Sequence, residues 1–483
     1  MTSLAAAWAA LAQRIGALGL EQVRVGWCDL HGVLRGKTLV VGSDAQATIA
    51  ALEEGIGMVG TLLLKDSSEH TVVKVFEPSA LASLPGLARF AGAANVQLRA
   101  DPDSLVALPW APGTGWLRAS AVWDDGTPLA LDSREALRAA LAALADAGHG
   151  LVCGLEVEFH IHRMLDTGLD TGLDDAPDVA AAGRPGAAPT VRHTHPGYRL
   201  LSEEHADAND EALAIVRRTA LGLGLPLRSL EIELGPSQFE AVFAPMDALA
   251  AADGLVLFRS GVRQALRRAG YLASFVCRPP LPHSVASGWH LHQSLVDRGG
   301  RNAMAGAGPG GLSPDGASWL AGLLAHAGAL AAVSAPSLDG ASRFAGSPMT
   351  PQAAVWAREN RGAMLRVAGH GAATRIENRL GEPMANPYLV MAAQVWAGLD
   401  GLQRGLQPPP AVETPYAETP TALRLPPTLA AAIDALDADA VMQRGFGAPL
   451  AQLYAVVKRH EIARFEAAED RAEWSRREYF GRY

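Results

Sequence analysis

Cysteine is scarce in this 483-residue chain, and its three cysteines, Cys28, Cys153 and Cys277, stand far apart without any CxxC pair. This spacing excludes a disulfide framework and a zinc ribbon, and it is typical of the reducing cytoplasm, where we expect the protein to reside. Aromatic residues (6%) and charged residues (19%) are also few. Because apolar residues make up 49%, a wholly disordered chain is excluded and a sizeable buried core is expected.

Positive charge is not in excess, since 41 Lys and Arg residues face 50 Asp and Glu residues, for a net charge of −9. This balance argues against a general nucleic-acid binder. The sequence also lacks a Walker A motif, an HExxH zinc motif and a GxSxG nucleophile motif. The glycines of 306–311 match GxGxxG, but Pro309 stands inside the motif and no strand–turn–helix pattern surrounds it, so we predict a loop there.

No membrane anchor is expected. Apolar residues from Leu4 to Ile15 recur at helical spacing without the basic segment of a signal peptide, and they predict an amphipathic helix. The most apolar stretch, 315–339, is rich in Ala and Gly and contains His326. It stands alone without a flanking basic cluster, so we predict a buried core helix rather than a membrane span.

The length of the chain exceeds what one ordinary core organises, which predicts two domains. A turn cluster at 124–128 marks the boundary that we expect, between a small domain over 1–127 and a large domain over 128–483. Strand-like runs within 21–41 flank a polar turn and predict a hairpin. Helices mixed with strands, without a regular βαβ rhythm, indicate an α+β fold.

Three further segments have clear local signals. A helix is predicted over 133–147, with Ser133 as its N-cap and Gly148 after its end. The stretch 165–196 is rich in Gly, Asp, Ala and Pro and predicts a loop, in which His193 and His195 are expected to be exposed. A second linker, rich in Pro, is expected over 408–427.

The most informative feature is a set of polar residues spaced two apart within apolar strands. Because side chains alternate between the faces of a strand, residues spaced in this way share one face. The sequences GLEVEFHIHR, SLEIEL, SQFE, GWHLHQSL and TRIENRL all show it. The residues concerned are Glu156, Glu158, Glu231, Glu233, Glu240, His290, His292, Ser294, Arg375, Glu377 and Arg379.

Any one of these pairs is explained by a solvated strand face, because antiparallel strands alternate apolar and polar side chains. Taken together, however, the residues are carboxylates, imidazoles and guanidiniums rather than Thr and Lys. Five carboxylates with one histidine match the ligand preference of two hard divalent cations such as Mg²⁺ or Mn²⁺. A neighbouring segment adds Arg343, Arg361 and Arg366, and the combined arginines predict anion binding, although any single one is explained as a helix-surface arginine.

The order of these motifs resembles the glutamine synthetase family. ExE is followed by a second acidic pair ending in SQFE, then GxHxHxSL, ENR, RIExR and NPYL, and the match continues to the closing WSRREYFGRY. The resemblance covers essentially the whole large domain, while the small domain matches more loosely through DLHGVLRGK. It implies a small β-grasp-like domain, a large catalytic domain around an open funnel of strands, and an oligomer of stacked rings, usually with twelve subunits.

The resemblance also implies roles for individual residues in an ATP-dependent ligase. Glu158, Glu233 and Glu240 would hold one Mg²⁺ or Mn²⁺ ion, and Glu156, His290 and Glu377 would hold another near the ATP phosphates. His292 and Ser294 would lie by the nucleotide, Arg361, Arg366 and Arg375 would contact phosphate oxygens, and Arg343 and Arg379 would bind the carboxylates of the substrate. Asp66, in LLLKDSSEH, is the candidate for a residue that reaches a neighbouring subunit's active site; a surface turn explains it equally well.

The sequence departs from family members that make glutamine. Met349 occupies the place of the glutamate that helps to bind ammonium, if no gap separates it from Arg361. A thioether neither attracts ammonium nor acts as a base. Val285 and Ala286 replace Asn-Gly in the glutamate-binding loop, which leaves the acid substrate open. Our leading hypothesis is therefore a ligase that forms a γ-glutamyl amide from an organic amine; the alternatives are an ammonia-using glutamine synthetase and a non-catalytic sensor or structural ring.

Overall fold

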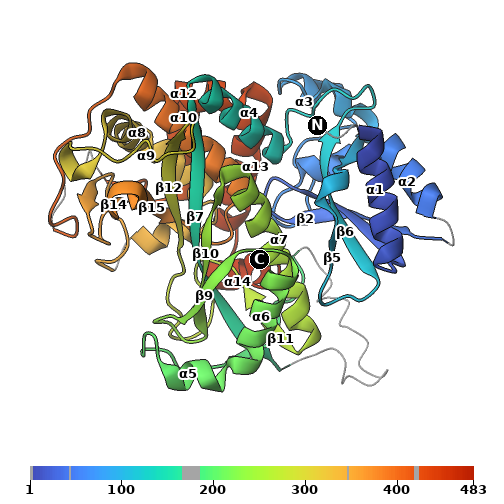
Figure 1. The fold of residues 1–483 in the computed structure, drawn as a ribbon, viewed down its shortest axis with the longest axis horizontal. Helices are drawn as coiled ribbons and strands as arrows, with labels where there is room; N and C mark the ends of the chain where they lie inside the picture. Colours follow the sequence, from blue (N-terminus) through green and yellow to red (C-terminus); the bar gives the residue numbers. More distant parts are fainter. Residues whose placement is uncertain (1–3, 43–44, 166–184, 345–346, 418–423) are drawn as a thin grey trace.

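The computed structural model of the chain describes residues 4–42, 45–165, 185–344, 347–417 and 424–483. It has a mixed α+β fold with two sheets, as the sequence predicts. A small six-stranded sheet is built by the N-terminal part of the chain, and a larger nine-stranded sheet by the part that follows (Figure 1). The small sheet lies to one side of the large one, and the C-terminal helices pack between and behind them (Figure 1).

The small sheet has the strand order β2-β1-β6-β4-β3, with β5 paired to β6. The predicted hairpin is confirmed, because β1 and β2 are antiparallel neighbours in continuous register. Strand β1 also runs parallel to β6 in the middle of the sheet. The strands are β1 (Gln22–Cys28), β2 (Leu34–Val40), β3 (Ile56–Val59), β4 (Asn95–Ala100), β5 (Val106–Ala107) and β6 (Thr114–Val122).

One face of the small sheet is covered by the first helix. It begins at Leu4 and buries Trp8, Leu11 and Ile15, so the predicted amphipathic helix is confirmed. Its apolar stripe therefore contributes to the core of this part of the molecule. The helices here are α1 (Leu4–Ala17), α2 (Ala45–Glu54) and α3 (Pro78–Ala82), with 3₁₀ turns η1 (Gly60–Leu64), η2 (Ala88–Ala93) and η3 (Pro102–Ser104).

The large sheet has the strand order β13-β14-β15-β12-β7-β10-β9, with β8 and β11 both paired to β7. Strand β7 spans sixteen residues and is the central strand of the sheet, since β10, β11 and β12 all pair with it. The strands are β7 (His149–Met164), β8 (Val191–His193), β9 (Leu227–Ile232), β10 (Gln238–Asp247), β11 (Tyr271–Ser274), β12 (Trp289–Asp297), β13 (Trp356–Arg358), β14 (Leu365–Ala368) and β15 (Arg375–Gly381).

Helices cover the outer face of this sheet, and the largely buried α10 packs against α8 and α4. Asn386 caps α10 through its side chain, and Pro387 occupies the first turn, which is why the helix begins there. The helices are α4 (Ser133–Asp146), α5 (Glu203–Ala208), α6 (Asp210–Gly222), α7 (Ala248–Arg268), α8 (Pro314–Ala325), α9 (Ala327–Ser334), α10 (Pro387–Arg404), α11 (Leu429–Ala438), α12 (Ala440–Phe446), α13 (Ala448–Glu466) and α14 (Arg471–Tyr479), with 3₁₀ turns η5 (Pro309–Gly311), η6 (Gly340–Phe344) and η7 (Gly371–Ala373).

Three local predictions are wrong. The N-cap of α4 is Asp132 rather than Ser133, because the Asp132 side chain accepts hydrogen bonds from the backbone N–H groups of Arg134 and Glu135. The predicted exposure of His195 is also wrong: its side chain is buried and stacks on His205. Of the loop predicted over 165–196, residues 166–184 lie outside the described residues, and 191–193 form β8 instead of a loop.

The apolar stretch 315–339 is buried, as predicted, but it forms two helices rather than one. Helices α8 and α9 meet at a bend of 73° beside His326. No single helix among the described residues is long and apolar enough to cross a membrane; α8 and α9 meet that test only as a bent pair, and nearly all their residues are buried.

Candidate active site

The register of the large sheet brings the polar residues of four strands onto one patch. Across β12 and β7, His290 lies directly opposite Glu156. Across β10 and β7, Glu240 lies opposite Glu158. Because strands separated by several loops are paired here, residues far apart in the sequence meet, as their shared alternation predicts.

The third pairing extends the patch to β15, where Glu377 lies opposite His292 of β12 and opposite Arg366 of β14. Glu233 follows the last residue of β9, beside β10. The sheet therefore collects all six carboxylates and histidines that the family resemblance assigns to metal ions.

His290 is at the centre of this acidic cluster. Its Nδ1 atom is 3.4 Å from Glu156 Oε2 and 3.9 Å from both Glu240 Oε2 and Glu377 Oε1. Its Nε2 atom is 3.8 Å from Glu158 Oε1. The imidazole is buried, so the four carboxylates surround a side chain with little access to bulk water.

Three overlapping groups in the cluster place their ligand atoms within 4.8 Å of one another. One consists of Glu158, Glu233 and Glu240, which is the first set implied by the resemblance. The other two combine Glu156 with His290 and Glu240, or with His292 and Glu377. The resemblance places His292 by the nucleotide, but here it belongs to the group with Glu156 and Glu377. Its Nε2 atom is 3.0 Å from Glu156 Oε1.

The electrostatics of the cluster demand a compensating positive charge. Burial, together with the neighbouring carboxylates, raises the pKa of Glu240 to about 10 and that of Glu158 to about 8. Burial also lowers the pKa of His290 to about 4, helped by Arg379, so the imidazole is neutral at pH 7. A neutral imidazole among carboxylates is the donor set that divalent cations bind.

The unpartnered atoms of the cluster fit the same interpretation. Among the described residues, His290 Nδ1 and His292 Nε2 are buried and form no hydrogen bond. An unsatisfied buried nitrogen costs free energy unless a ligand binds it. The residues present therefore fit a divalent cation, which would accept both lone pairs.

Sequence reasoning missed one residue of the site, Gln238. Its amide Nε2 donates hydrogen bonds to Glu158 Oε2 at 3.1 Å and to the Ala286 carbonyl at 3.3 Å. The backbone N–H of Gly288 also donates to Glu158 Oε2, at 2.8 Å. Gln238 thus links the 285–288 loop to the acidic cluster. The signal was present, since Gln238 stands two residues before Glu240 and shares its face of β10.

Four of the five predicted arginines lie at the cluster. Arg366 Nε is 2.9 Å from Glu377 Oε2, and Arg379 forms a close ion pair with Glu377 Oε1. Arg343 is buried and donates from Nη1 to the carbonyls of Arg379 and Leu380 at 3.0 and 2.9 Å. Burial lowers the pKa of Arg343 and of Arg366, which means that both guanidiniums are poorly solvated. Such groups bind anions more strongly than exposed ones.

The remaining nucleotide candidates are less closely engaged. Arg375 donates from Nε to His292 Nδ1 at 3.1 Å, so it supports the imidazole that contacts Glu156. Ser294 donates to the Thr374 carbonyl at 3.1 Å instead of contacting the cluster. Arg361 lies exposed in the turn between β13 and β14. The structure therefore brings Arg375 to the cluster and leaves Ser294 and Arg361 at its margin.

Met349 lies beside the arginines. Its carbonyl accepts a hydrogen bond from Arg379 Nη2 at 3.3 Å, while its side chain is 53% exposed. Because Arg379 in turn pairs with Glu377, Met349 is one contact away from the acidic cluster. Its apolar side chain faces solvent at this position.

Asp66 is placed differently from the other candidates. Its carboxylate is buried in its own chain, where it accepts hydrogen bonds from the backbone N–H groups of Ser68 and His70 and pairs with Arg464 at 2.9 Å. The structure does not bring it to the acidic cluster of this chain. Its reach into a neighbouring active site stays a prediction, and it requires the carboxylate to leave these partners.

Comparison with known proteins agrees with this geometry. Residues 130–479 match the family model described as glutamine synthetase, catalytic domain. The chain is 38% identical to a γ-glutamylanilide synthase from Acinetobacter sp. over 96% of this chain and 94% of the relative. It is 30% identical to γ-glutamylethanolamide synthetase GlnA4 from Streptomyces coelicolor, over 97% and 94% of the two chains.

A solved structure, GmaS in complex with ADP, superimposes with a TM-score of 0.78 at 28% identity, covering 97% of this chain and 98% of that one. The agreement therefore extends over both sheets, the smaller as well as the larger. Since the family model covers most of the chain and its strands carry the acidic cluster, this protein belongs to the glutamine synthetase family.

Proposed function

We propose that the protein is an ATP-dependent ligase that joins glutamate to an organic amine and forms a γ-glutamyl amide. The observation that carries the proposal is the acidic cluster with its arginines, complete beside Met349, which replaces a charged residue at the ammonium site. An amine with an apolar body gains from contact with such a side chain, whereas ammonium does not.

The chemistry explains why this site needs so many charged groups. A carboxylate resists attack by an amine because oxide is a poor leaving group. Transfer of the γ-phosphoryl group of ATP to the glutamate γ-carboxylate makes an acyl phosphate, and attack by the amine then releases phosphate. The buried guanidiniums of Arg343, Arg366 and Arg379 would neutralise the charge on the substrate's oxygens. The acyl phosphate must also be protected from water until the amine attacks it.

We assign two divalent cations, Mg²⁺ or Mn²⁺, to the acidic cluster. One would be held by Glu158, Glu233 and Glu240, and the other by Glu156 and Glu377 with an imidazole. His290 and His292 both offer a free nitrogen for that second position. Such cations would balance the charge that develops on the transferred phosphoryl group. We assign His292, Ser294, Arg361, Arg366 and Arg375 to ATP.

We propose an aromatic or small aliphatic amine as the second substrate. The relative that is 38% identical is named for γ-glutamylanilide and the one that is 30% identical for γ-glutamylethanolamide. Aniline, a planar apolar amine, fits the loss of charge at Met349 better than ethanolamine does. Val285 and Ala286 lie in the loop that Gln238 joins to Glu158, and they replace the Asn-Gly of glutamine-making members. The acid substrate therefore stays open, and glutamate is the first acid to test.

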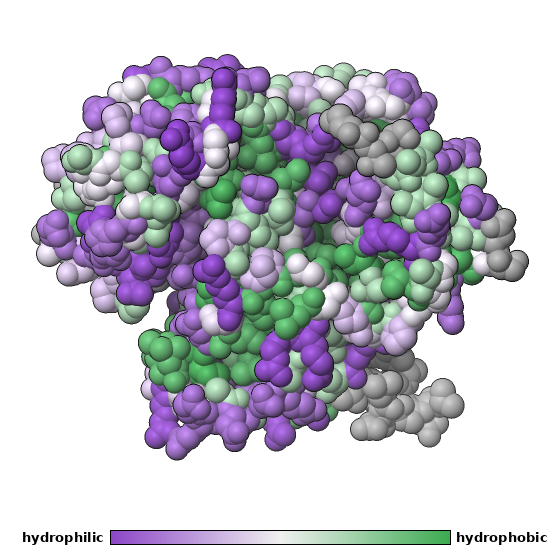
Figure 2. All heavy atoms as spheres, in the orientation of Figure 1, coloured by the Kyte–Doolittle hydropathy of each residue, from purple (hydrophilic) through white to green (hydrophobic). Residues whose placement is uncertain are grey.

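We also propose a homo-oligomer of two stacked six-membered rings. Large apolar side chains are exposed beside Glu233, and Figure 2 shows apolar residues gathered over this part of the face, near α5 and the end of β9. Tyr198, Leu201 and Leu234 are between 44 and 61% exposed, and the backbones of Tyr198 and Leu234 are hydrogen-bonded. An apolar patch of this kind marks a protein interface. Light scattering that finds an active monomer would contradict the ring.

Two smaller assignments complete the proposal. We assign the protein to the cytoplasm, because its three cysteines are all free and buried, as expected in a reducing compartment. We place the domain boundary at 127/128, which falls between β6 of the small sheet and α4, the first helix of the large domain.

The test of the ligase activity is an isotope transfer. Glutamate labelled with ¹⁸O in its γ-carboxylate is incubated with Mg·ATP and aniline, and the released phosphate and organic product are analysed by mass spectrometry. We expect one ¹⁸O atom in phosphate and an equal amount of γ-glutamylanilide, with neither formed by Glu377→Ala. An ammonia-using enzyme would transfer ¹⁸O to phosphate only when ammonium is present. A non-catalytic ring would give no labelled phosphate with any amine.

A further inference from the structure

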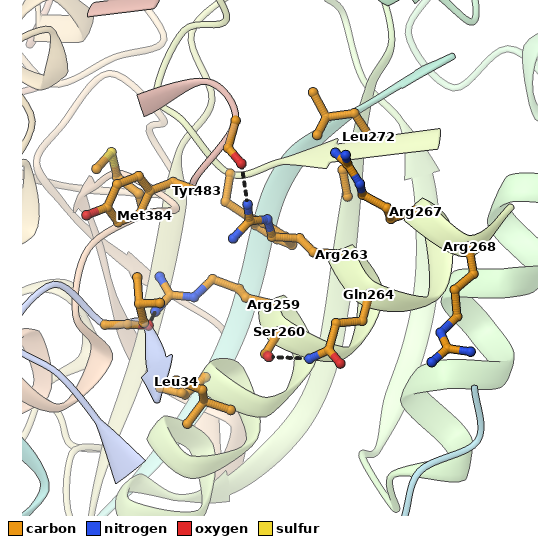
Figure 3. A pocket seen from close by; sticks show the side chains of 16 residues that line it. Leu34, Arg259, Ser260, Arg263, Gln264, Arg267, Arg268, Leu272, Met384 and Tyr483 are labelled. Atoms are coloured by element: carbon orange, nitrogen blue, oxygen red, sulfur yellow. Dashed lines mark hydrogen bonds between the residues drawn. The ribbon is translucent and has the colours of Figure 1, made fainter. Parts of the chain in front are cut away.

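A second cavity lies away from the acidic cluster, between α7, β11, the hairpin turn and the C-terminal residues (Figure 3). Its volume is about 730 Å³, which is within the range of small-molecule sites. The residues that line it include Leu34 of the small sheet, Arg263 of α7, Leu272 of β11 and Tyr483. The residues assigned above to the cations and to ATP are not among them.

The charged side chains that line this cavity are all of one sign. Arg259, Arg263, Arg267 and Arg268 come from α7, and no Asp or Glu is among the sixteen residues that line the cavity. In the part of the chain that the structure describes, none of these four arginines forms an ion pair. Four guanidiniums that form no ion pair with a carboxylate side chain give the cavity a positive potential.

The arginines differ in how far they are already used. Arg259 is occupied, because it donates to the carbonyls of Gly32, Pro383 and Ala385 at 2.7 to 3.0 Å. Arg263 makes one such bond, to Gly481 at 3.0 Å, while its buried Nε atom has no partner among the described residues.

Arg267 lies one helical turn after Arg263 on the same side of α7 (Figure 3). Two guanidiniums one turn apart, with donors to spare, match a ligand with two anionic groups. Burial lowers the pKa of Arg263 to about 10, and Arg259 and Arg267 add to this effect. An anion between Arg263 and Arg267 would relieve their mutual repulsion.

The rest of the cavity wall is mostly apolar. Leu34, Leu272, Met384 and Tyr483 are among the residues that surround the arginines (Figure 3). A ligand for this cavity therefore needs an anionic end for the arginines and a compact body for the apolar wall. A chloride ion or a single phosphate fills only the first part.

We propose that this cavity binds a small organic molecule with two anionic groups, phosphate or carboxylate, held by Arg263 and Arg267. The cavity is separate from the ligase site but is joined to its sheet. Strand β11 pairs with β7, so that Leu272 lies opposite His162, four residues beyond Glu158. The proposal does not rest on the ligase function, because it concerns binding in the absence of any substrate.

The test is isothermal titration of the full-length protein, in EDTA and at fixed ionic strength, with pyrophosphate and with citrate as separate probes. We expect at least one probe to bind at one site per chain, and the better probe distinguishes phosphate from carboxylate chemistry. Arg263→Gln and Arg267→Gln should each weaken binding about ten-fold or more, because each removes a charged hydrogen-bond donor. Arg263→Lys should retain part of the affinity.

Two matched variants control the assignment. Arg218→Gln removes a charge from the exposed face of α6, and Arg366→Gln removes one from the ligase site; neither should change the affinity. Loss of binding in Arg366→Gln, or no binding of either probe by the wild type, would overturn the proposal. A smaller oligomer of Arg267→Gln in light scattering, without any probe binding to the wild type, would show instead that the cavity is a contact between copies. If Arg263→Gln fails to fold, Arg267→Gln decides the result.

Discussion

In the metal-free protein, two carboxyl groups of the acidic cluster make the free energy of unfolding depend on pH. The folded chain holds protons on Glu240 and Glu158, whose pKa values are raised from 4.5 to about 10 and about 8. A carboxyl group with a raised pKa contributes stability that is present below pH 4.5 and is lost as pH rises through its folded pKa. A divalent cation binds the deprotonated groups and relieves this loss.

We therefore predict that Mg²⁺ raises the melting temperature of the protein more at pH 8.5 than at pH 6. Differential scanning calorimetry with and without Mg²⁺ at roughly 5 mM measures the difference. Glu240→Gln should reduce both the pH dependence and the gain from Mg²⁺, since it removes the most shifted carboxyl group. A gain that is equal at both pH values would show that the cluster does not bind the cation through these protons.

We propose that Met349 determines how well the site uses ammonium. Met349→Glu places a carboxylate next to Arg379 and at the predicted amine entrance, where a charge about 4 Å from ammonium contributes roughly 1–4 kcal/mol. We predict that the variant gains about ten-fold or more in kcat/KM for ammonium and loses activity with aniline. Met349→Gln, which is polar but uncharged, is the matched control. Equal gains in both variants would show that charge at this position is not the cause.

The residue scale is also where sequence reasoning is strongest. The alternation in GLEVEFHIHR, SQFE and TRIENRL places the carboxylates and imidazoles on one face, and sheet pairing then brings the faces together. It missed Gln238, although this residue has the same two-residue spacing before Glu240, because only carboxylates, imidazoles and guanidiniums were counted. It also chose Ser133 over Asp132 as the N-cap, since both residue types favour that position and only the backbone geometry decides between them.

At the scale of the element, the junction of α8 and α9 is fastened by one histidine. His326 stands at the bend and contacts Asp439 Oδ2 at 2.6 Å and Asp400 Oδ2 at 3.1 Å. Burial opposes protonation, but the two aspartates outweigh it and raise the pKa of His326 above its ordinary value of 6.5. The imidazolium thus joins the bend to α10 and to the N-cap of α12.

We predict that His326→Gln lowers the free energy of unfolding by about 1.5–3 kcal/mol at pH 6, because it removes a buried charged hydrogen-bonding group. Since the pKa is raised in the fold, this contribution is complete below the unfolded pKa near 6.5 and is lost as pH rises through the folded pKa. Urea unfolding at pH 6 and at pH 9 measures both values. A difference that grows with pH would have the wrong sign and would contradict the assignment.

Long-range contacts explain what the sequence could not predict at this scale. Strand β8 forms because β7 is long enough to pair with it, although 191–193 read as part of a loop. His195 is also buried by long-range contacts, since its ring stacks on His205 and meets the ring of Phe239 edge-on. The arginines of α7 have helical spacing, but that spacing does not tell whether carboxylates from other elements neutralise them.

At the scale of the whole molecule, the small domain is fastened to the C-terminal helices by a buried carboxylate. Glu478 of α14 is fully buried, accepts hydrogen bonds from the hydroxyls of Ser67 and Ser68, and pairs with both terminal nitrogens of Arg464. Asp66 completes the network at Arg464. A buried network of ion pairs and hydrogen bonds therefore joins the domains. No local sequence pattern predicts it.

Removing that carboxylate should destabilise the interface between the domains. We predict that Glu478→Gln lowers the free energy of unfolding by about 1.5–3 kcal/mol, because it removes the charge of a buried carboxylate that accepts hydrogen bonds from the partly buried Arg464. Glu473→Gln, on the exposed side of the same helix, should change stability by less than about 0.5 kcal/mol. Chemical denaturation of the two variants measures the contrast. Equal stability in both variants would show that the network does not hold the domains.

The most direct test of an organic-amine ligase is the comparison of kcat/KM for ammonium with kcat/KM for aniline, ethanolamine and isopropylamine, under saturating glutamate and Mg·ATP. A phosphate-release assay gives every value on the same enzyme preparation. We predict that an organic amine exceeds ammonium, since each buried methylene contributes about 0.8 kcal/mol and no carboxylate at position 349 attracts the small cation. If ammonium gives the highest kcat/KM for the wild-type protein, the protein is a glutamine synthetase and the proposed function is wrong.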